Sequence, residues 1–298
     1  MSTAQSHAAT SAGGKHRRAL AWVLALVLTY VGVEVVGGLV TRSLTLLADA
    51  GHMATDALGV GMALAAVSAA RRGARNPTHT FGHYRWEVLA ALANAALLLG
   101  VAVYVAVEGI ARLRDPVEVD AGPMLLIAIG GLAVNLVSFR LLHAGSKESL
   151  NVRGAYLEVM ADAIGSVGVI ASAIVILTTG WPYTDAVVAL ALAAFIVPRA
   201  LSLGREAIRI VVQAAPASID VDALTQRLGR LPSVTDVHDV HVWTLTSGMD
   251  VASVHLVSEQ THTADVVRAA QRLLREHGVA HATVQVDDDV GGECGAEW

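Results

Sequence analysis

Six apolar stretches, each at least 20 residues long, constrain the fold of this 298-residue chain more than any other feature. An α-helix rises 1.5 Å per residue, so about 20 apolar residues cross the ~30 Å hydrocarbon core of a bilayer. Only 16% of the residues are charged, whereas soluble domains carry about 25%. The sequence therefore predicts an α-helical membrane protein with six transmembrane helices, at residues 19–40, 44–70, 84–111, 122–145, 152–179 and 184–203.

The pattern changes after about residue 212, where the apolar runs become shorter. A helix at 219–230, strands at 234–245 and 250–258, a helix at 262–277 and a strand at 280–287 are expected there. This order is typical of a small α+β domain of ferredoxin-like type. We predict three regions: a flexible cytoplasmic N-terminal tail (1–18), a six-helix transmembrane domain (19–212) and a ferredoxin-like domain (213–298).

Lys and Arg residues indicate the orientation, because they are enriched in cytoplasmic segments. With the N-terminus inside, thirteen of the sixteen Lys and Arg residues before residue 213 lie on the inner side, Arg199 among them. An even number of spans then places both termini in the cytoplasm. Short loops and a compact length favour a bacterial inner membrane.

Residues 213–298 hold 5 basic and 13 acidic residues, a net charge of −8. An acidic domain argues against nucleic acid as a partner, which requires a basic face, and suits either cation attraction or plain solubility. A single cysteine, Cys294, excludes an internal disulfide.

Two of the predicted spans carry pairs of ionisable residues, which are costly inside a bilayer. His52 and Asp56 are four residues apart, as are Glu158 and Asp162, so each pair lies on one helix face. Both pairs lie about ten residues, or ~15 Å, into their spans. We therefore expect one imidazole and three carboxylates to converge near the membrane midplane, as tetrahedral Zn²⁺ binding requires. Interhelical hydrogen bonding, or a proton path without metal, is the alternative.

Four stretches resemble the cation diffusion facilitator family, in its zinc/cobalt/cadmium exporter branch. They are residues 43–56 (SLTLLADAGHMATD), 80–87 (TFGHYRWE), 151–157 (NVRGAYL) and 238–243 (HDVHVW), and the resemblance spans residues 19–287. It implies a homodimer, six spans, a cytoplasmic ferredoxin-like domain for metal binding and dimerisation, and metal/proton antiport. The family's two ligand pairs map to His52 with Asp56 and to Glu158 with Asp162.

One departure concerns the metal. The zinc branch usually has His where this chain has Glu158, so the expected site has one nitrogen and three oxygens. Harder donors favour Mn²⁺ or Fe²⁺, although Zn²⁺ also accepts carboxylates. We keep zinc as the first expectation for the transported ion and for a regulatory ligand.

Accessory metal ligands are expected among the cytoplasmic histidines. Pairing two strands about residues 247–248 sets His241 roughly opposite His255, close enough to share an ion. His238 and His281 are further candidates in this domain, and the resemblance adds His83. Surface or capping roles are the alternative for each.

The sequence thus predicts a divalent metal exporter that exchanges its substrate for protons. Metal binding displaces protons from its ligands, and His52 is best suited to carry a proton at neutral pH, with Asp49 as a second candidate on the same helix face. An enzyme is not expected, because neither H-E-x-x-H nor G-x-S-x-G occurs. An exporter of Mn, Fe, Co or Cd, a membrane metal sensor that does not translocate, and a proton-coupled transporter of another solute are the alternatives.

Overall fold

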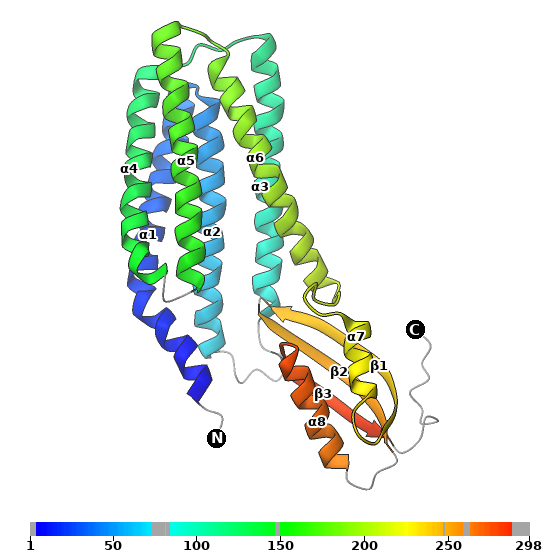
Figure 1. The fold of residues 1–298 in the computed structure, drawn as a ribbon. Coiled ribbons are helices and arrows are strands. Elements are labelled where there is room, and N and C mark those ends of the chain that lie inside the picture. The colour runs from blue at the N-terminus through cyan, green and yellow to red at the C-terminus, as the bar shows by residue number, and fades with distance from the viewer. Residues whose placement is uncertain are drawn as a thin grey trace. The chain divides into compact units, whose positions relative to one another are not determined.

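The computed structural model describes residues 4–72, 81, 84–146, 150–246, 248–258 and 263–287 (Figure 1). The six long helices are α1 (Ala4–Thr41), α2 (Leu44–Arg72), α3 (Tyr84–Arg114), α4 (Ala121–Ser146), α5 (Leu150–Thr179) and α6 (Thr184–Val211). The C-terminal elements are α7 (Val221–Gly229), β1 (Val234–Thr246), β2 (Met249–Ser258), α8 (Thr263–Glu276) and β3 (Val279–Asp287). Their order is the predicted one, and α1 also includes residues 4–18, where the sequence predicts a tail.

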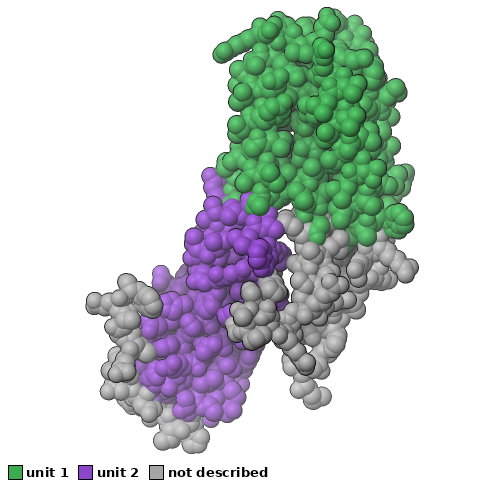
Figure 2. Space-filling model, turned by 180° about the vertical axis from the view of Figure 1, so that it is seen from behind, with its two compact units in different colours: residues 1–68, 93–204 green, residues 69–92, 205–298 purple. Residues whose placement is uncertain are grey.

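The chain forms two compact units, coloured separately in Figure 2. The first comprises residues 1–68 and 93–204, and the second comprises residues 69–92 and 205–298. The first turns of α3 therefore belong to the same unit as the C-terminal elements. The division at residues 18 and 212 that the sequence suggests stays a prediction.

Five of the described helices are long and apolar enough to cross a membrane. They are α1 from Leu20, α3, α4 up to His143, α5 from Tyr156, and α6. These helices expose large apolar side chains, among them Leu126 (73% exposed), Ile164 and Phe195. A surface of this kind suits hydrocarbon rather than water, so the helical part is an integral membrane domain.

The remaining long helix, α2, is the central helix of the first unit. None of its side chains from Leu44 to Ala57 is exposed. Met53 packs in one apolar cluster with side chains of α1, α4 and α5, Leu46 packs with α4 and α5, and Ala48 packs with α3 and α6. Because the side chains from Leu44 to Ala57 are enclosed by protein, this part of α2 can carry ionisable residues without exposing them to lipid.

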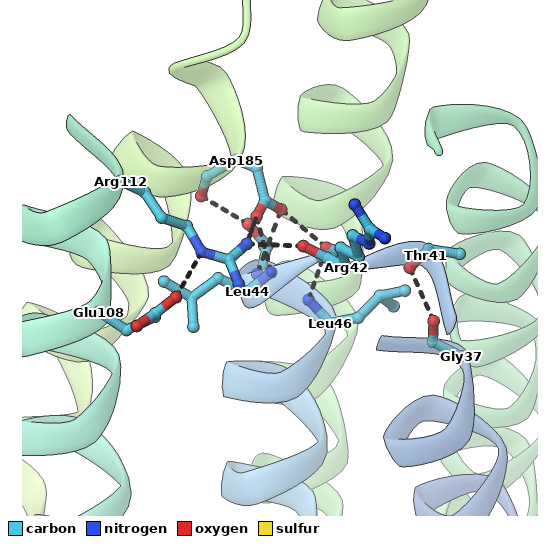
Figure 3. A network of polar contacts seen from close by, with 10 residues as sticks. Gly37, Thr41, Arg42, Leu44, Leu46, Glu108, Arg112 and Asp185 are labelled. Carbon is cyan, nitrogen blue, oxygen red and sulfur yellow. Dashed lines mark hydrogen bonds and ion pairs between the residues drawn. The ribbon is translucent and has the colours of Figure 1, made fainter. Parts of the chain in front are cut away.

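The N-terminus of α2 is fixed by Asp185, at the start of α6 (Figure 3). One carboxylate oxygen accepts from Ser43 Oγ at 2.7 Å and from the Thr45 amide at 3.2 Å. The other accepts from the Leu44 amide at 2.7 Å. The first amides of a helix have no partner within it, so Asp185 acts as a cap supplied by a neighbouring helix.

Arg112 of α3 completes this network (Figure 3). Its Nη1 lies 3.5 Å from Asp185 Oδ2 and donates to the carbonyl of Arg42 at 2.6 Å, and its Nε donates to Glu108 at 2.9 Å. Arg42 lies between α1 and α2 with φ at 58°, a left-handed conformation that needs support from its surroundings. The network fixes the position from which α2 begins, and hence the height of every side chain along it.

In the second unit, the strands form a mixed three-stranded sheet in the order β1-β2-β3. β1 and β2 are antiparallel, and β3 runs parallel to β2. Both α7 and α8 contribute to the core on this sheet, through Leu228 and Leu274, which pack with Val254 and Leu256. Thr246, at the end of β1, donates a 2.7 Å hydrogen bond to Glu87 in the first turn of α3.

Candidate metal-binding site

Three of the four predicted ligands meet between α2 and α5. His52 Nε2 lies 3.6 Å from Asp56 Oδ2 and 3.5 Å from Asp162 Oδ1. One ligand atom from each residue lies within 4.8 Å of the other two. Donors at 2.0–2.1 Å from a tetrahedral Zn²⁺ lie about 3.3 Å apart, so a small inward adjustment would bring these atoms to coordination distance. The set of one imidazole and two carboxylates suits Zn²⁺ and its neighbours.

The ligand atoms at this site are buried and lack hydrogen-bond donors. The side chains of His52, Asp56 and Asp162 are 8%, 11% and 4% exposed. Asp56 Oδ2 and Asp162 Oδ1 have no hydrogen-bond partner among the described residues. A buried carboxylate oxygen without a donor is costly, and a bound cation would remove that cost. The arrangement therefore favours a binding site over a structural hydrogen-bond network.

The fourth predicted ligand, Glu158, has a different partner. Its Oε1 accepts a 2.8 Å hydrogen bond from Arg199 Nη2, and the same nitrogen lies 3.5 Å from Asp56 Oδ1. Arg199 is in α6, so a third helix contributes to the site. From its sequence position, Arg199 was predicted on the cytoplasmic side, without this contact. The available signal was its position directly after Pro198, inside the apolar stretch 184–203.

Two further buried carboxylates lie in the first unit. Asp49, one turn before His52, is 3% exposed, and a Cβ at Gly165 of α5 would lie 3.0 Å from its Oδ1. Glu34 of α1 is 1% exposed, and neither of its oxygens has a hydrogen-bond partner among the described residues. The small size of Gly165 thus leaves room for the Asp49 carboxylate. The proton-carrying role of Asp49 stays a prediction.

The second unit contains another candidate ligand set, formed by His238, His255 and Asp287. One ligand atom of each lies within 4.8 Å of the others. His238 Nδ1 lies 3.1 Å from Asp236 Oδ2, and His255 Nδ1 lies 4.0 Å from Asp287 Oδ2. All three side chains are half-buried. Sequence reasoning missed Asp287, because it lies at the end of the last strand in a run of three aspartates.

The predicted pairing of His241 with His255 is wrong. His238 is the residue opposite His255, and His241 is opposite Ser253. The register shifts between Thr244 and Thr246, before the pair of His241 with Ser253, and again between His238 and His241, where Asp239 has φ at 51°. A bulge of this kind inserts a residue into one strand and changes which side chains face one another. His241 is exposed.

The two remaining accessory candidates do not join this set. His281 is exposed and pairs with Val251, whereas the neighbour of His255 on β3 is Gln285. His83 lies outside the described residues. Of the five accessory histidines that the sequence suggests, the structure brings His238 and His255 together.

A membrane-embedded helical unit with buried candidate metal ligands, joined to a small α+β unit with a second candidate set, defines an integral membrane protein with candidate divalent-metal sites. The family model for the cation efflux transmembrane domain matches residues 20–212, and that for the cation efflux protein cytoplasmic domain matches residues 216–289. The chain therefore belongs to the cation efflux, or cation diffusion facilitator, family, in its zinc/cobalt/cadmium branch.

Similar proteins cover almost the whole chain. The metal cation efflux system protein CzcD of Cupriavidus metallidurans is 39% identical over 92% of this chain and 87% of its own length. The zinc transporter ZitB of Escherichia coli is 38% identical over 95% of this chain and 92% of its own. A cadmium, cobalt and zinc/H⁺-K⁺ antiporter of Bacillus subtilis is 33% identical over 93% and 90%. The family consists of transporters rather than enzymes.

Proposed function

We propose that this protein exports divalent metal ions, principally zinc, from the cytoplasm in exchange for protons. The observation that carries the proposal is the cluster of His52, Asp56 and Asp162. Its ligand atoms face one another, and the two carboxylate oxygens have no hydrogen-bond donor among the described residues. The names of the similar proteins support it, since they describe zinc transporters and a zinc/H⁺-K⁺ antiporter. The metal is the substrate of this site.

The exchange follows from the chemistry of the ligands. A metal ion binds neutral imidazole and deprotonated carboxylate, so binding displaces protons, and protonation releases the ion. His52 is the ligand best suited to take up a proton near neutral pH, and Asp49 is the nearby carboxylate that could pass it on. Movement of α2 and α5 between an inward-open and an outward-open arrangement would then couple the two fluxes.

We further propose six membrane spans, with both termini in the cytoplasm of a bacterial cell membrane. Five helices are long and apolar enough to span a membrane. The sixth span is α2, because it packs among these five helices. The C-terminal unit is of ferredoxin-like type, since its α-β-β-α-β order is that fold without the first strand. It mediates a homodimer and binds Zn²⁺ as a regulatory ligand at His238, His255 and Asp287.

Metal flux into proteoliposomes across a pH gradient tests the export proposal directly. Wild type should move Zn²⁺ and acidify the opposite phase, and Asp162→Ala should do neither. Asp115→Asn, which changes an exposed carboxylate between α3 and α4, is the matched control and should transport normally. If Mn²⁺ or Fe²⁺ moves and Zn²⁺ does not, the zinc assignment is wrong. Binding without flux of any metal would support a sensor instead.

A further inference from the structure

Arg199 is the feature of the metal site that the ligand chemistry does not explain. A divalent cation site normally excludes other cations, yet one guanidinium nitrogen lies 2.8 Å from Glu158 and 3.5 Å from Asp56. The contact comes from α6, which provides none of the expected ligands. A buried or half-buried charge pair in a membrane is expensive to form, so its presence beside the substrate site requires a reason.

The two oxygens of Asp56 have different partners. Oδ1 faces Arg199 at 3.5 Å, whereas Oδ2 lies 3.6 Å from His52 and has no hydrogen-bond partner among the described residues. Arg199 therefore leaves the inward oxygen of Asp56 available to a metal ion. Partners that contact a metal ligand from outside commonly fix its orientation in this way.

Exposure separates the same residues into two groups. Arg199 and Glu158 are 35% and 36% exposed, whereas the side chains of Asp56, His52 and Asp162 are at most 11% exposed. Glu158 and Arg199 thus lie at the rim of the site, and the other three side chains form its interior. A hydrogen bond of 2.8 Å between ionised groups is among the stronger side-chain contacts, so it competes with metal for the Glu158 carboxylate.

The charges also separate Arg199 and Glu158 from the three inner residues. Three carboxylates around a divalent ion would leave one uncompensated negative charge. The Arg199 guanidinium removes that excess, so His52, Asp56 and Asp162 present the two negative charges that balance a divalent ion. Arg serves this purpose well, because its guanidinium is always charged and has a rigid planar donor set.

We propose that Arg199 determines metal specificity by holding Glu158 out of the ligand set. The ion then meets one imidazole, two carboxylates and one open position, a set that Zn²⁺ accepts. Without Arg199, Glu158 becomes a third carboxylate ligand, and the harder donor set favours Mn²⁺. This inference rests on the proposed export function for His52, Asp56 and Asp162, and it replaces the predicted role of Glu158 as a direct ligand.

Metal binding to the purified full-length protein tests the inference, with His255→Gln in every variant to disable the cytoplasmic ligand set. Zn²⁺ and Mn²⁺ affinities are compared for Arg199→Gln, Glu158→Gln and the double variant. Arg199→Gln should raise Mn²⁺ affinity relative to Zn²⁺ by roughly tenfold. The double variant should restore the original ratio, because the released carboxylate is then absent. The double variant should also keep Zn²⁺ affinity within about threefold of wild type, less than the loss from removing a ligand's supporting partner, because it removes both charges together. Glu158→Gln alone leaves Arg199 unbalanced 3.5 Å from Asp56 and should therefore weaken the binding of both ions.

Two results would overturn the inference. One is a loss of Zn²⁺ binding in the double variant as complete as that in Asp162→Ala, since Glu158 would then be a direct ligand. The other is an unchanged Mn²⁺ to Zn²⁺ ratio in Arg199→Gln. Arg205→Gln, which removes an exposed cation farther along α6, controls for general charge effects and should leave the ratio unchanged. Failure of the export proposal itself would be distinct, because proteoliposomes would then show no metal flux while the binding ratios of these variants could still be measured.

Discussion

Two buried charged clusters in the helical unit differ in how their carboxylates are satisfied. At the start of α2, both oxygens of Asp185 accept hydrogen bonds from Ser43 or backbone amides, and Arg112 balances the charge. Between α2 and α5, the facing oxygens of Asp56 and Asp162 have no hydrogen-bond donor in the described part of the chain. The difference favours a structural role for the first cluster and the proposed metal-binding role for the second.

Loss of transport in Asp162→Asn is the largest effect expected. The substitution keeps the shape of the side chain and removes a charged ligand atom, so Zn²⁺ flux should fall below detection, a loss of at least ~100-fold. Initial rates in proteoliposomes measure this, with Asp115→Asn reconstituted in parallel. Residual flux above a few per cent of wild type would mean that Asp162 does not bind the substrate.

The same substitution at Asp185 should primarily affect folding. Asp185→Asn leaves Glu108 as the carboxylate partner of Arg112 and weakens the charged hydrogen bonds that cap α2, at a cost of about 3 kcal/mol. We expect a lower thermal unfolding midpoint in detergent and, in the protein that remains folded, Zn²⁺ affinity close to wild type. A large drop in affinity without a drop in stability would contradict the structural role of this cluster.

A smaller effect is expected from the second ligand set. His238→Ala and His255→Ala should each weaken Zn²⁺ binding to the C-terminal unit by at least about tenfold, while metal flux continues. His241→Ala and His281→Ala are matched controls, because both side chains are exposed and neither belongs to the set. Metal content per chain after dialysis measures the difference. Equal losses in all four variants would mean that the observed strand register does not determine the site.

Ser43→Ala should give the smallest change. The Ser43 hydroxyl donates to Asp185 at 2.7 Å and accepts from the Leu46 amide at 3.1 Å. Replacing a capping Ser with Ala costs ~1 kcal/mol, about a third of the effect expected for Asp185→Asn. Thermal unfolding of both variants tests this order. A greater loss for Ser43→Ala would place the main support of α2 elsewhere.

The long elements could be predicted from the sequence because their signals are local. Apolar length identified the six helices, and the spacing of His52 with Asp56 placed two ligands on one face of α2. Because the two residue pairs lie at similar depths in their predicted spans, Asp162 was expected close to His52 and Asp56. Each of these inferences uses the regular rise of a helix, which tertiary contacts leave unchanged.

The contacts that the sequence did not reveal depend on pairings between distant elements. In the sequence, Arg199 lies near the inner end of a predicted span, and its contact with Glu158 is visible only when α5 and α6 are placed side by side. In the sequence, Asp185 is an ordinary acidic residue in the first turn of a helix. Its role as a cap for α2 depends on the start of α2 lying next to it. Two register shifts in β1, between Thr244 and Thr246 and between His238 and His241, changed which histidine faces His255, because each shift alters the pairs beyond it.

The thermal stability of the metal-free protein is the most direct test of the difference between the Asp185 cluster and the metal site. Asp162→Asn and Asp185→Asn are to be melted side by side in chelator, with wild type as reference. An unsatisfied carboxylate is a cost to the folded state, so Asp162→Asn should melt at or above the wild-type temperature. Asp185→Asn should melt well below it. Comparable destabilisation by both substitutions would contradict the account, because Asp162 would then support the fold as Asp185 does.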